Sequence, residues 1–416
     1  MARTVWLALL LGGAVGVLAG LYLDAVRLTQ DLLWDHADPV LPGDGRWQVV
    51  VICAAGGLLV GVLRMRHDRD SPHDLEDALL GLDEVLDDDE RTPPPKASWL
   101  VRAAALGVVS LAFGASLGPE APLILLATGF GERLARILRT TRSEAAFISS
   151  AGALAGLFGG PLAAVALPLE RGRATAHASR LIGAGLVAGV AGLATMLLVI
   201  PGSVGTTYVL PDADLGSGRD LLRALGWAAA AALPATVAGV ALLLLTDPVR
   251  RLAERLAPST VLRAAAGGLV LGLCGAADGL TLFSGEHQGQ ELIDSAGERA
   301  ALAFLALAAL KVVATLACLG TGWFGGQIFP ATFAGMAAAL AVTSVWESAP
   351  VAAVVAAGAG ATATAVLRRP LATVLVLLLF FPLGAVLALA VGAGVGALAL
   401  GLLGDRVPET RPLGSH

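Results

Sequence analysis

The sequence predicts an all-α, polytopic membrane protein whose helices are broken inside the bilayer and whose two halves form inverted repeats. Three observations predict this class. The chain of 416 residues is 56% hydrophobic and only 15% charged, with a mean hydropathy of +0.77, whereas soluble domains carry about 25% charged residues. Several uncharged runs reach the roughly 20 residues that a membrane-spanning helix needs. Matched Gly/Pro-rich interruptions occur in the two halves, as in transporters built from inverted repeats.

The apolar spans can be placed in order along the chain. The N-terminal run is interpreted as a membrane helix, because it lacks a convincing signal-peptide cleavage site. The last run is long enough for two segments, which Pro382 and Gly384 could separate. The spans are expected at 5–23, 47–63, from 99 to a break at Glu120, and at 145–169, 181–200, 224–246, 264–277, 300–319, 328–345, 351–367 and 371–403.

Charge indicates how the spans are oriented. Clusters of arginine follow three of them, and the positive-inside rule places these ends together in the cytoplasm; they are Arg133, Arg136 and Arg139, then Arg171 and Arg173, then Arg250, Arg251 and Arg255. The loop 201–220 has few positive charges and is expected outside. The acidic linker at 74–90 is expected to face water, and a net charge of -5 does not suggest nucleic-acid binding.

These boundaries divide the chain into four expected regions. Residues 1–96 would hold N-terminal membrane helices and the acidic linker, 97–220 the core of the first repeat, and 221–404 the second repeat. Residues 405–416 would form a short tail, with no C-terminal regulatory domain.

The most informative residue is Glu120, a lone carboxylate in an apolar setting. A charge at bilayer depth costs a few kcal/mol or more on insertion scales, so it indicates function. Gly118 and Pro119 predict the end of one helix and Pro122 the start of another. Unpaired N–H groups and the positive end of the dipole make a helix N-terminus an anion site. The alternative is a helix cap on a loop that faces water.

A second break resembles the first. GASLGPEAP ends at Pro122, and GWFGGQIFP ends at Pro330, 208 residues later. Pro161-Leu162-Ala163 and Pro370-Leu371-Ala372 then follow at an offset of 209. Two interrupted segments in corresponding halves indicate a midplane site between repeats, although Ala/Gly-rich membrane sequence also produces chance similarity.

Together these motifs resemble the CLC family of chloride channels and chloride/proton antiporters over nearly the whole chain. GPEAP at 118–122 resembles the family's GREGP motif, so the gating glutamate falls on Glu120. The segments 151–171, 320–335 and 358–377 are similar to three further family segments in the family's order. The resemblance implies transport of chloride or another small anion through a glutamate-gated pathway, a homodimer with one pore per subunit, and a place in the plasma membrane.

The resemblance also implies the residues of the anion site. They are Ser71, Gly118, Pro119, Ala121, Gly326, Gln327, Ile328 and Phe329. The family's serine motif falls on RDSPH, which lacks both glycines, so the alignment of Ser71 could shift. The family's phenylalanine slot falls on Ile328, but backbone N–H groups could still bind an anion there. The family's central tyrosine has no counterpart, because the chain has only Tyr22 and Tyr208.

The proton route of the family's antiporters is also altered. Their inner proton glutamate aligns with Arg171, which cannot relay protons near neutrality. Glu170 is the nearest substitute and a candidate for a proton pathway, but it could equally pair with a neighbouring arginine. We therefore expect anion flux without obligatory proton exchange, or a different proton route. The alternatives are a proton-coupled chloride antiporter and a fluoride antiporter.

No cofactor, metal site or enzyme activity is expected. Ser149, Ser150, Ser284 and His287 form no recognisable catalytic constellation, which argues against a membrane protease or lipid transferase. Glu286 and His287 lack the second ligand pair of a metal site. Lys311, inside an apolar run, is expected to snorkel or to form a salt bridge, and Cys53, Cys274 and Cys318 to be buried.

Overall fold

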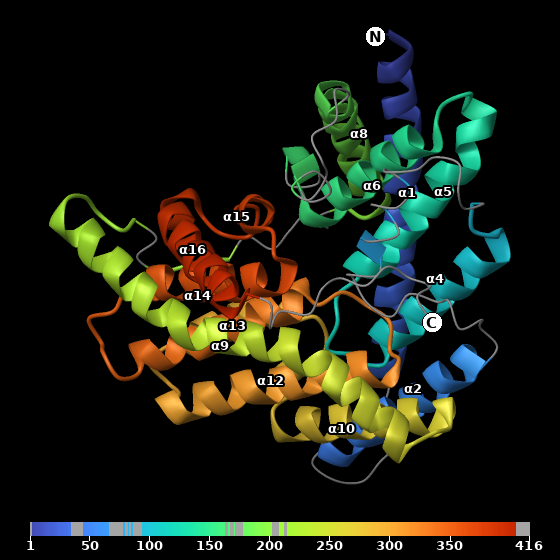
Figure 1. Ribbon diagram of the computed structural model, residues 1–416. Helices are drawn as coiled ribbons and strands as arrows, with labels where there is room; N and C mark the ends of the chain where they lie inside the picture. Colours follow the sequence, from blue (N-terminus) through green and yellow to red (C-terminus); the bar gives the residue numbers. More distant parts are fainter. Residues whose placement is uncertain are drawn as a thin grey trace.

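The computed structural model confirms an all-α fold in the part of the chain that it describes (Figure 1). It describes residues 2–34, 45–65, 78, 79, 82, 85, 94–162, 165, 166, 170, 178–201, 208–211 and 214–404. Ser71, Arg171 and nearly all of the acidic linker lie outside these residues.

The helices of the first half are α1 (Ala2–Trp34), α2 (Arg46–Met65), α4 (Ala97–Ala112), α5 (Glu120–Leu138), α6 (Arg142–Phe158) and α8 (Ala178–Val199). Those of the second half are α9 (Arg219–Leu256), α10 (Thr260–Ala277), η1 (Gly279–Thr281), α11 (Gln288–Asp294), α12 (Ala301–Thr321), α13 (Ile328–Thr343), α14 (Val351–Leu367), α15 (Pro370–Leu377), η2 (Leu383–Ala385) and α16 (Val386–Leu403). The predicted interruption near Pro382 is confirmed, since Pro382 precedes η2.

Within the described residues, seven helices are long and apolar enough to cross a membrane. The multi-pass prediction is therefore confirmed. In contrast, α13 and α14 have only 16 and 17 residues. Every residue of α13 is buried in the protein, as is nearly all of α14. A helix that is apolar on all sides belongs in a core, and these two helices form the centre of the second half.

Small residues allow the helices to approach closely, as is typical of membrane bundles. At the contact between α1 and α8, a Cβ added to Gly16 would overlap the backbone of Gly192, and one added to Gly12 would overlap Ala188. The close helix packing that the high glycine and alanine content predicts is thus present at this contact.

Each half contains one helix that ends near the centre of the molecule and is followed by a new helix. After α4 the chain turns at Gly114, with φ of 88°, and after α12 it turns at Gly322, with φ of 96°. The two turning glycines are 208 residues apart, which is the offset of the repeated motifs. Glycine adopts this left-handed conformation without steric cost, so the repeat in the sequence becomes a repeat in the backbone.

Candidate anion site at two broken helices

The two breaks meet each other. Gly118 N–H donates to the carbonyl of Gly326 at 2.7 Å, and Gly326 N–H donates to the carbonyl of Gly118 at 2.6 Å. This pair forms an isolated antiparallel bridge. Because α5 begins two residues after Gly118 and α13 two residues after Gly326, the bridge brings both helix N-termini to one point.

Side chains on the adjacent helices hold the second break in place. The N–H of Phe324 donates to Ser110 Oγ of α4 at 3.0 Å, and Trp323 Nε1–H donates to the carbonyl of Ala264 in α10 at 3.1 Å. Ser116, in the first break, lies 3.0 Å from Thr315 Oγ1 of α12. These buried hydrogen bonds fix the position of both N-termini without using any charged group.

The carboxyl group of Glu120 occupies the space between the two breaks. Its side chain is fully buried, and its Oε1 accepts a hydrogen bond from Phe329 N–H at 3.3 Å. Its Oε2 is buried without a hydrogen-bond partner among the described residues. A Cβ added to Gly118 or to Gly326 would overlap Oε2, so only glycine at both positions leaves room for this oxygen.

The N-terminus of α13 has no other cap. Gln327 precedes the helix and its side chain makes no capping hydrogen bond. Pro330 has no N–H, so Ile328 and Phe329 carry the N–H groups of the first turn that lack a helical partner. Negative charge is favourable at such a terminus. The Glu120 carboxylate therefore lies where a small anion would be stabilised.

Two residues of the site were missed by the sequence analysis. Phe158, at the end of α6, and Phe380, after α15, both pack on Phe329, with ring centroids 6.1 and 5.4 Å away. All three rings are buried. They form an apolar wall on one side of the site, in a chain that contains only 11 phenylalanines. Their scarcity was the only sign of this wall in the sequence.

A cavity of about 440 Å³ reaches the site from one face of the protein. Leu117 and Pro119, which flank Gly118 in the first break, line its inner end. Its walls include Arg27, Trp34, Glu286 and His287. The cavity therefore extends as far as the residue before Glu120, whose own side chain is fully buried.

Glu170 lies at a different helix terminus. Its Oε1 accepts from Leu371 N–H at 2.9 Å and its Oε2 from Ala372 N–H at 2.6 Å. Both N–H groups belong to the first turn of α15. The side chain of the N-cap residue of α15 makes no capping hydrogen bond. The structure thus places Glu170 apart from the bridge of Gly118 and Gly326, as the cap of a second-half helix.

Lys311 corrects one expectation. Its side chain is fully buried, so it does not snorkel, and it forms no ion pair with a carboxylate among the described residues. Instead Nζ donates to the carbonyls of Thr281, Leu282 and Phe283 at 3.1, 3.0 and 2.9 Å and lies 4.9 Å from the centre of the Phe333 ring. Four carbonyls are within its reach, counting Leu280 at 3.4 Å, because the chain after η1 turns around it.

The remaining candidates form no catalytic group in the described chain. Ser150 Oγ donates to the carbonyl of Phe147, and Ser284 Oγ accepts from the N–H of Glu286. No described cluster of three or more His, Cys, Asp and Glu residues could hold a metal ion. Cys53, Cys274 and Cys318 are buried and free, as expected.

Comparison with known proteins agrees with this geometry. The family model described as voltage gated chloride channel matches residues 82–401. YfeO, a candidate ion-transport protein of Escherichia fergusonii, is 30% identical over 358 residues, covering 82% of this chain and 79% of its own. YfeO of Escherichia coli has the same identity and coverage.

Solved structures share the fold at low identity. A slow cyanobacterial Cl⁻/H⁺ antiporter superposes with a TM-score of 0.79 at 20% identity, covering 97% of this chain and 95% of its own. A CLC-type fluoride/proton antiporter gives 0.75 at 18% identity, covering 95% and 96%. The family match, the relatives and the two broken helices that meet at Glu120 agree: the chain belongs to the CLC family of anion-transport proteins and is not an enzyme.

Proposed function

We propose that this chain carries chloride or another small halide across the plasma membrane through a pathway that Glu120 opens and closes. The observation that supports the proposal most directly is the carboxylate of Glu120 on the N-terminus of α13, with one hydrogen bond of 3.3 Å and one oxygen unpaired. A group held so weakly in an anion site can be displaced by an anion.

The gate follows from charge. The ionised carboxylate takes the place of the anion at the N–H groups of Ile328 and Phe329. Protonation removes that charge, so the side chain can leave toward the cavity and an anion can enter. The site uses backbone dipoles rather than a full positive charge, and such sites bind weakly enough to let an ion depart. Gly118, Pro119, Ala121, Gly326 and Gln327 would shape it, and Ser71, which lies outside the described residues, is proposed as a further anion-binding residue.

The orientation follows from the arginine clusters. Arg3, near the start of α1, donates to the carbonyls of Leu138 and Arg139 at the end of α5. The other end of α1 carries Arg27 and Trp34, which line the cavity. By the positive-inside rule the end with Arg139 is cytoplasmic, and the cavity opens outward. A homodimer with one pathway in each subunit completes the proposal.

Proton coupling is a separate question. Both antiporters with similar folds exchange their anion for protons. Here Glu170 uses both oxygens as acceptors for N–H groups of α15, and protonation would weaken these hydrogen bonds, which are stronger to the ionised carboxylate. We therefore propose that protons control Glu120 without passing through Glu170. Uphill anion movement driven by a proton gradient and abolished by Glu170→Gln would overturn this.

Anion efflux from liposomes tests the proposed function. The purified wild type should release chloride faster at pH 5 than at pH 8, and Glu120→Gln should remove that difference. Glu254→Gln, on an exposed part of α9, is the matched control and should behave as wild type. A Glu120→Gln protein with unchanged pH dependence would exclude Glu120 as the gate.

Fluoride is the second candidate substrate, favoured by the fluoride/proton antiporter among the similar folds. Because the chloride and fluoride antiporters resemble this chain almost equally, with TM-scores of 0.79 and 0.75, the fold does not discriminate between the anions. Efflux of each anion from the same preparation does: a fluoride rate more than about tenfold above the chloride rate, about 1.4 kcal/mol in selectivity, would assign fluoride.

A further inference from the structure

The cavity beside Pro119 is lined by two acids, Asp31 and Glu286, and the gating mechanism uses neither of them. Glu286 lies in the connection between α10 and α12, outside the membrane-spanning helices. It lines the same cavity as Pro119, the residue before Glu120. Glu286 is therefore close enough to Glu120 for the charge of Glu120 to act on it, although the two acids belong to opposite halves of the chain.

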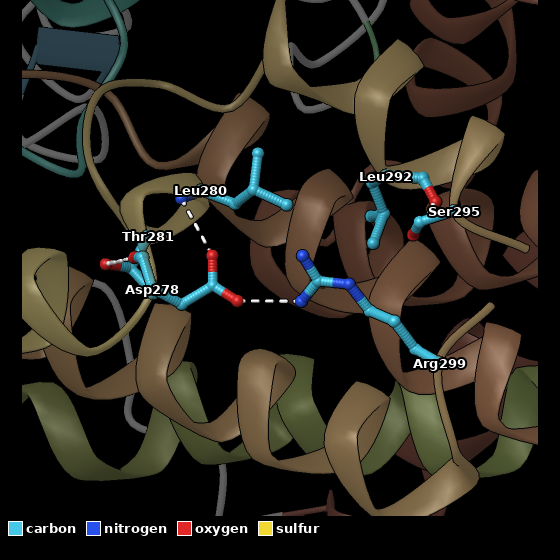
Figure 2. Close-up of polar contacts among 6 residues, drawn as sticks. All are labelled: Asp278, Leu280, Thr281, Leu292, Ser295 and Arg299. Carbon is cyan, nitrogen blue, oxygen red and sulfur yellow. Dashed lines mark hydrogen bonds and ion pairs between the residues drawn. The ribbon is translucent and has the colours of Figure 1, made fainter.

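The segment that carries Glu286 is anchored at its beginning. Figure 2 shows Asp278 bridging two elements: its Oδ1 accepts from Leu280 N–H at 3.1 Å, and its Oδ2 lies 2.7 Å from Arg299. Thr281 Oγ1 donates to the carbonyl of Asp278 at 2.8 Å. Lys311 then holds the next carbonyls, through Phe283. Four side chains, those of Asp278, Thr281, Arg299 and Lys311, thus hold the chain up to the residue before Ser284.

The backbone of Glu286 is fixed as well. Its N–H donates to Ser284 Oγ at 3.3 Å, and its carbonyl accepts from the Tyr208 hydroxyl at 2.9 Å. Gln290, in α11, further joins this segment to Val209 through hydrogen bonds of 2.8 and 3.1 Å. The backbone N–H and carbonyl of Glu286 both have partners, so the hydrogen bonds hold the backbone from which its side chain extends at the cavity.

The other charged or titratable residues that line the cavity are Arg27 and Asp31, on α1, and His287, the neighbour of Glu286. Glu120, at the start of α5, does not line the cavity, but its charge acts on Glu286. Among the described residues, no cation forms an ion pair with Glu286. Burial raises the pKa of Glu286 to about 8, and the negative charge of Glu120 contributes to the rise. A carboxyl group in this range both gains and loses protons near neutrality.

We propose that Glu286 is the outer proton-exchange residue, which passes protons between water in the cavity and the carboxylate of Glu120. This inference rests on the proposed function, because it requires that Glu120 be the gate. Neutral Glu286 gives its proton, directly or through cavity water, to ionised Glu120. Glu286 becomes the carboxylate and Glu120 the neutral acid. Water or buffer in the cavity then returns a proton to Glu286.

Membrane vesicles of fixed orientation test this role. In right-side-out vesicles, a drop in outer pH should start anion flux, and Glu286→Gln should slow that onset by at least about tenfold, as loss of a proton-transfer group does. Flux after full acidification should equal the wild type. Glu286→Asp should restore the onset to within about threefold, and so should a high concentration of small buffer outside. In inside-out vesicles the onset should be unchanged.

Asp31→Asn is the matched control, because Asp31 lines the same cavity on α1; its onset should match the wild type. An onset in Glu286→Gln that stays within about twofold of the wild type would overturn the inference. So would equal slowing in both vesicle orientations, since that would indicate a structural effect. Failure of the proposed function is distinguishable: Glu120→Gln would then keep its pH dependence, whatever Glu286→Gln does.

Discussion

Glu120 and Glu170 are both acids of the first half of the chain whose oxygens face the start of a helix in the second half. They differ in how firmly they are held. Glu120 has one hydrogen bond of 3.3 Å and one unpaired oxygen, and it is fully buried. Glu170 has one short hydrogen bond to each oxygen, at 2.9 and 2.6 Å, and is partly exposed.

This difference is the basis for proposing that Glu120 can move and that Glu170 stays in place. An unpaired buried oxygen costs about 1 to 3 kcal/mol, so the buried position of the Glu120 carboxyl group is less well stabilised than that of Glu170. Glu170 would lose two charge-assisted bonds on moving, each of them stronger than a neutral hydrogen bond. The same chemical arrangement, a carboxylate on a helix N-terminus, is a structural cap at Glu170, and we propose that it serves as a gate at Glu120.

The largest expected effect comes from filling the place of the Glu120 carboxyl. Gly326→Leu should reduce anion flux at least about 100-fold, because the new side chain would occupy the position of Oε2, and overpacking costs about 1 to 3 kcal/mol. Gly394→Leu is the control, since a Cβ at Gly394 on α16 meets open space. Stopped-flow efflux from liposomes measures both, and a freely conducting Gly326→Leu protein would contradict the placement of the site.

Next in size is the pH response. As pH falls, Glu120 gains a proton, loses its charge and leaves the site, so flux should rise at least about tenfold between pH 8 and pH 5. In Glu120→Gln the flux at pH 5 should exceed the flux at pH 8 by no more than about twofold. Glu170→Gln should leave the wild-type ratio intact. If both variants lost the pH response equally, the two acids would not differ as the structure indicates.

Thermal stability should also distinguish Glu120 from Glu170. Glu170→Ala should lower stability by about 0.5 to 2 kcal/mol, the loss of a helix cap, and lower the midpoint of thermal unfolding by a few degrees. Glu120→Ala removes a buried unpaired oxygen and should leave the midpoint equal or higher. Tryptophan fluorescence in detergent records both midpoints. A larger loss in Glu120→Ala would reverse the assignment of the fixed and the movable acid.

The smallest effect is expected in the apolar wall. Phe329→Ala keeps the N–H that binds Glu120 but removes two ring contacts, each worth about 0.5 to 1.5 kcal/mol, so flux or selectivity should change by less than about tenfold. Ile328→Ala, at the neighbouring first position of α13, should change them less. Competing chloride and fluoride efflux measures the ratio, and complete loss of flux in Phe329→Ala would show that the side chain, rather than the backbone, forms the site.

The sequence predicted the parts that local chemistry determines. Glycine and proline ended and restarted the helices near Glu120 and Gln327, and the offset of 208 residues predicted that these breaks would correspond. Glu170 as a cap of α15 could not be predicted, because it depends on where α15 lies relative to a residue 201 positions earlier. The same holds for Phe158 and Phe380. The prediction for Lys311 was wrong because burying a lysine costs free energy unless hydrogen-bond acceptors surround it. Here the acceptors are backbone carbonyls, and only the fold brings them together.

The bridge between Gly118 and Gly326 has a consequence for biosynthesis. Its two glycines are separated by 208 residues. At a synthesis rate of about 5 to 20 residues per second, Gly326 is therefore added about 10 to 40 s after Gly118. During that interval Glu120 has been translated but its partner helix has not. In a nascent chain that ends before α13, the Glu120 side chain has no helix N-terminus to contact. The insertion machinery must then shield this acid, or it must stay protonated in the lipid. The bridge can therefore form only after Gly326, in the last quarter of the chain, has been synthesised.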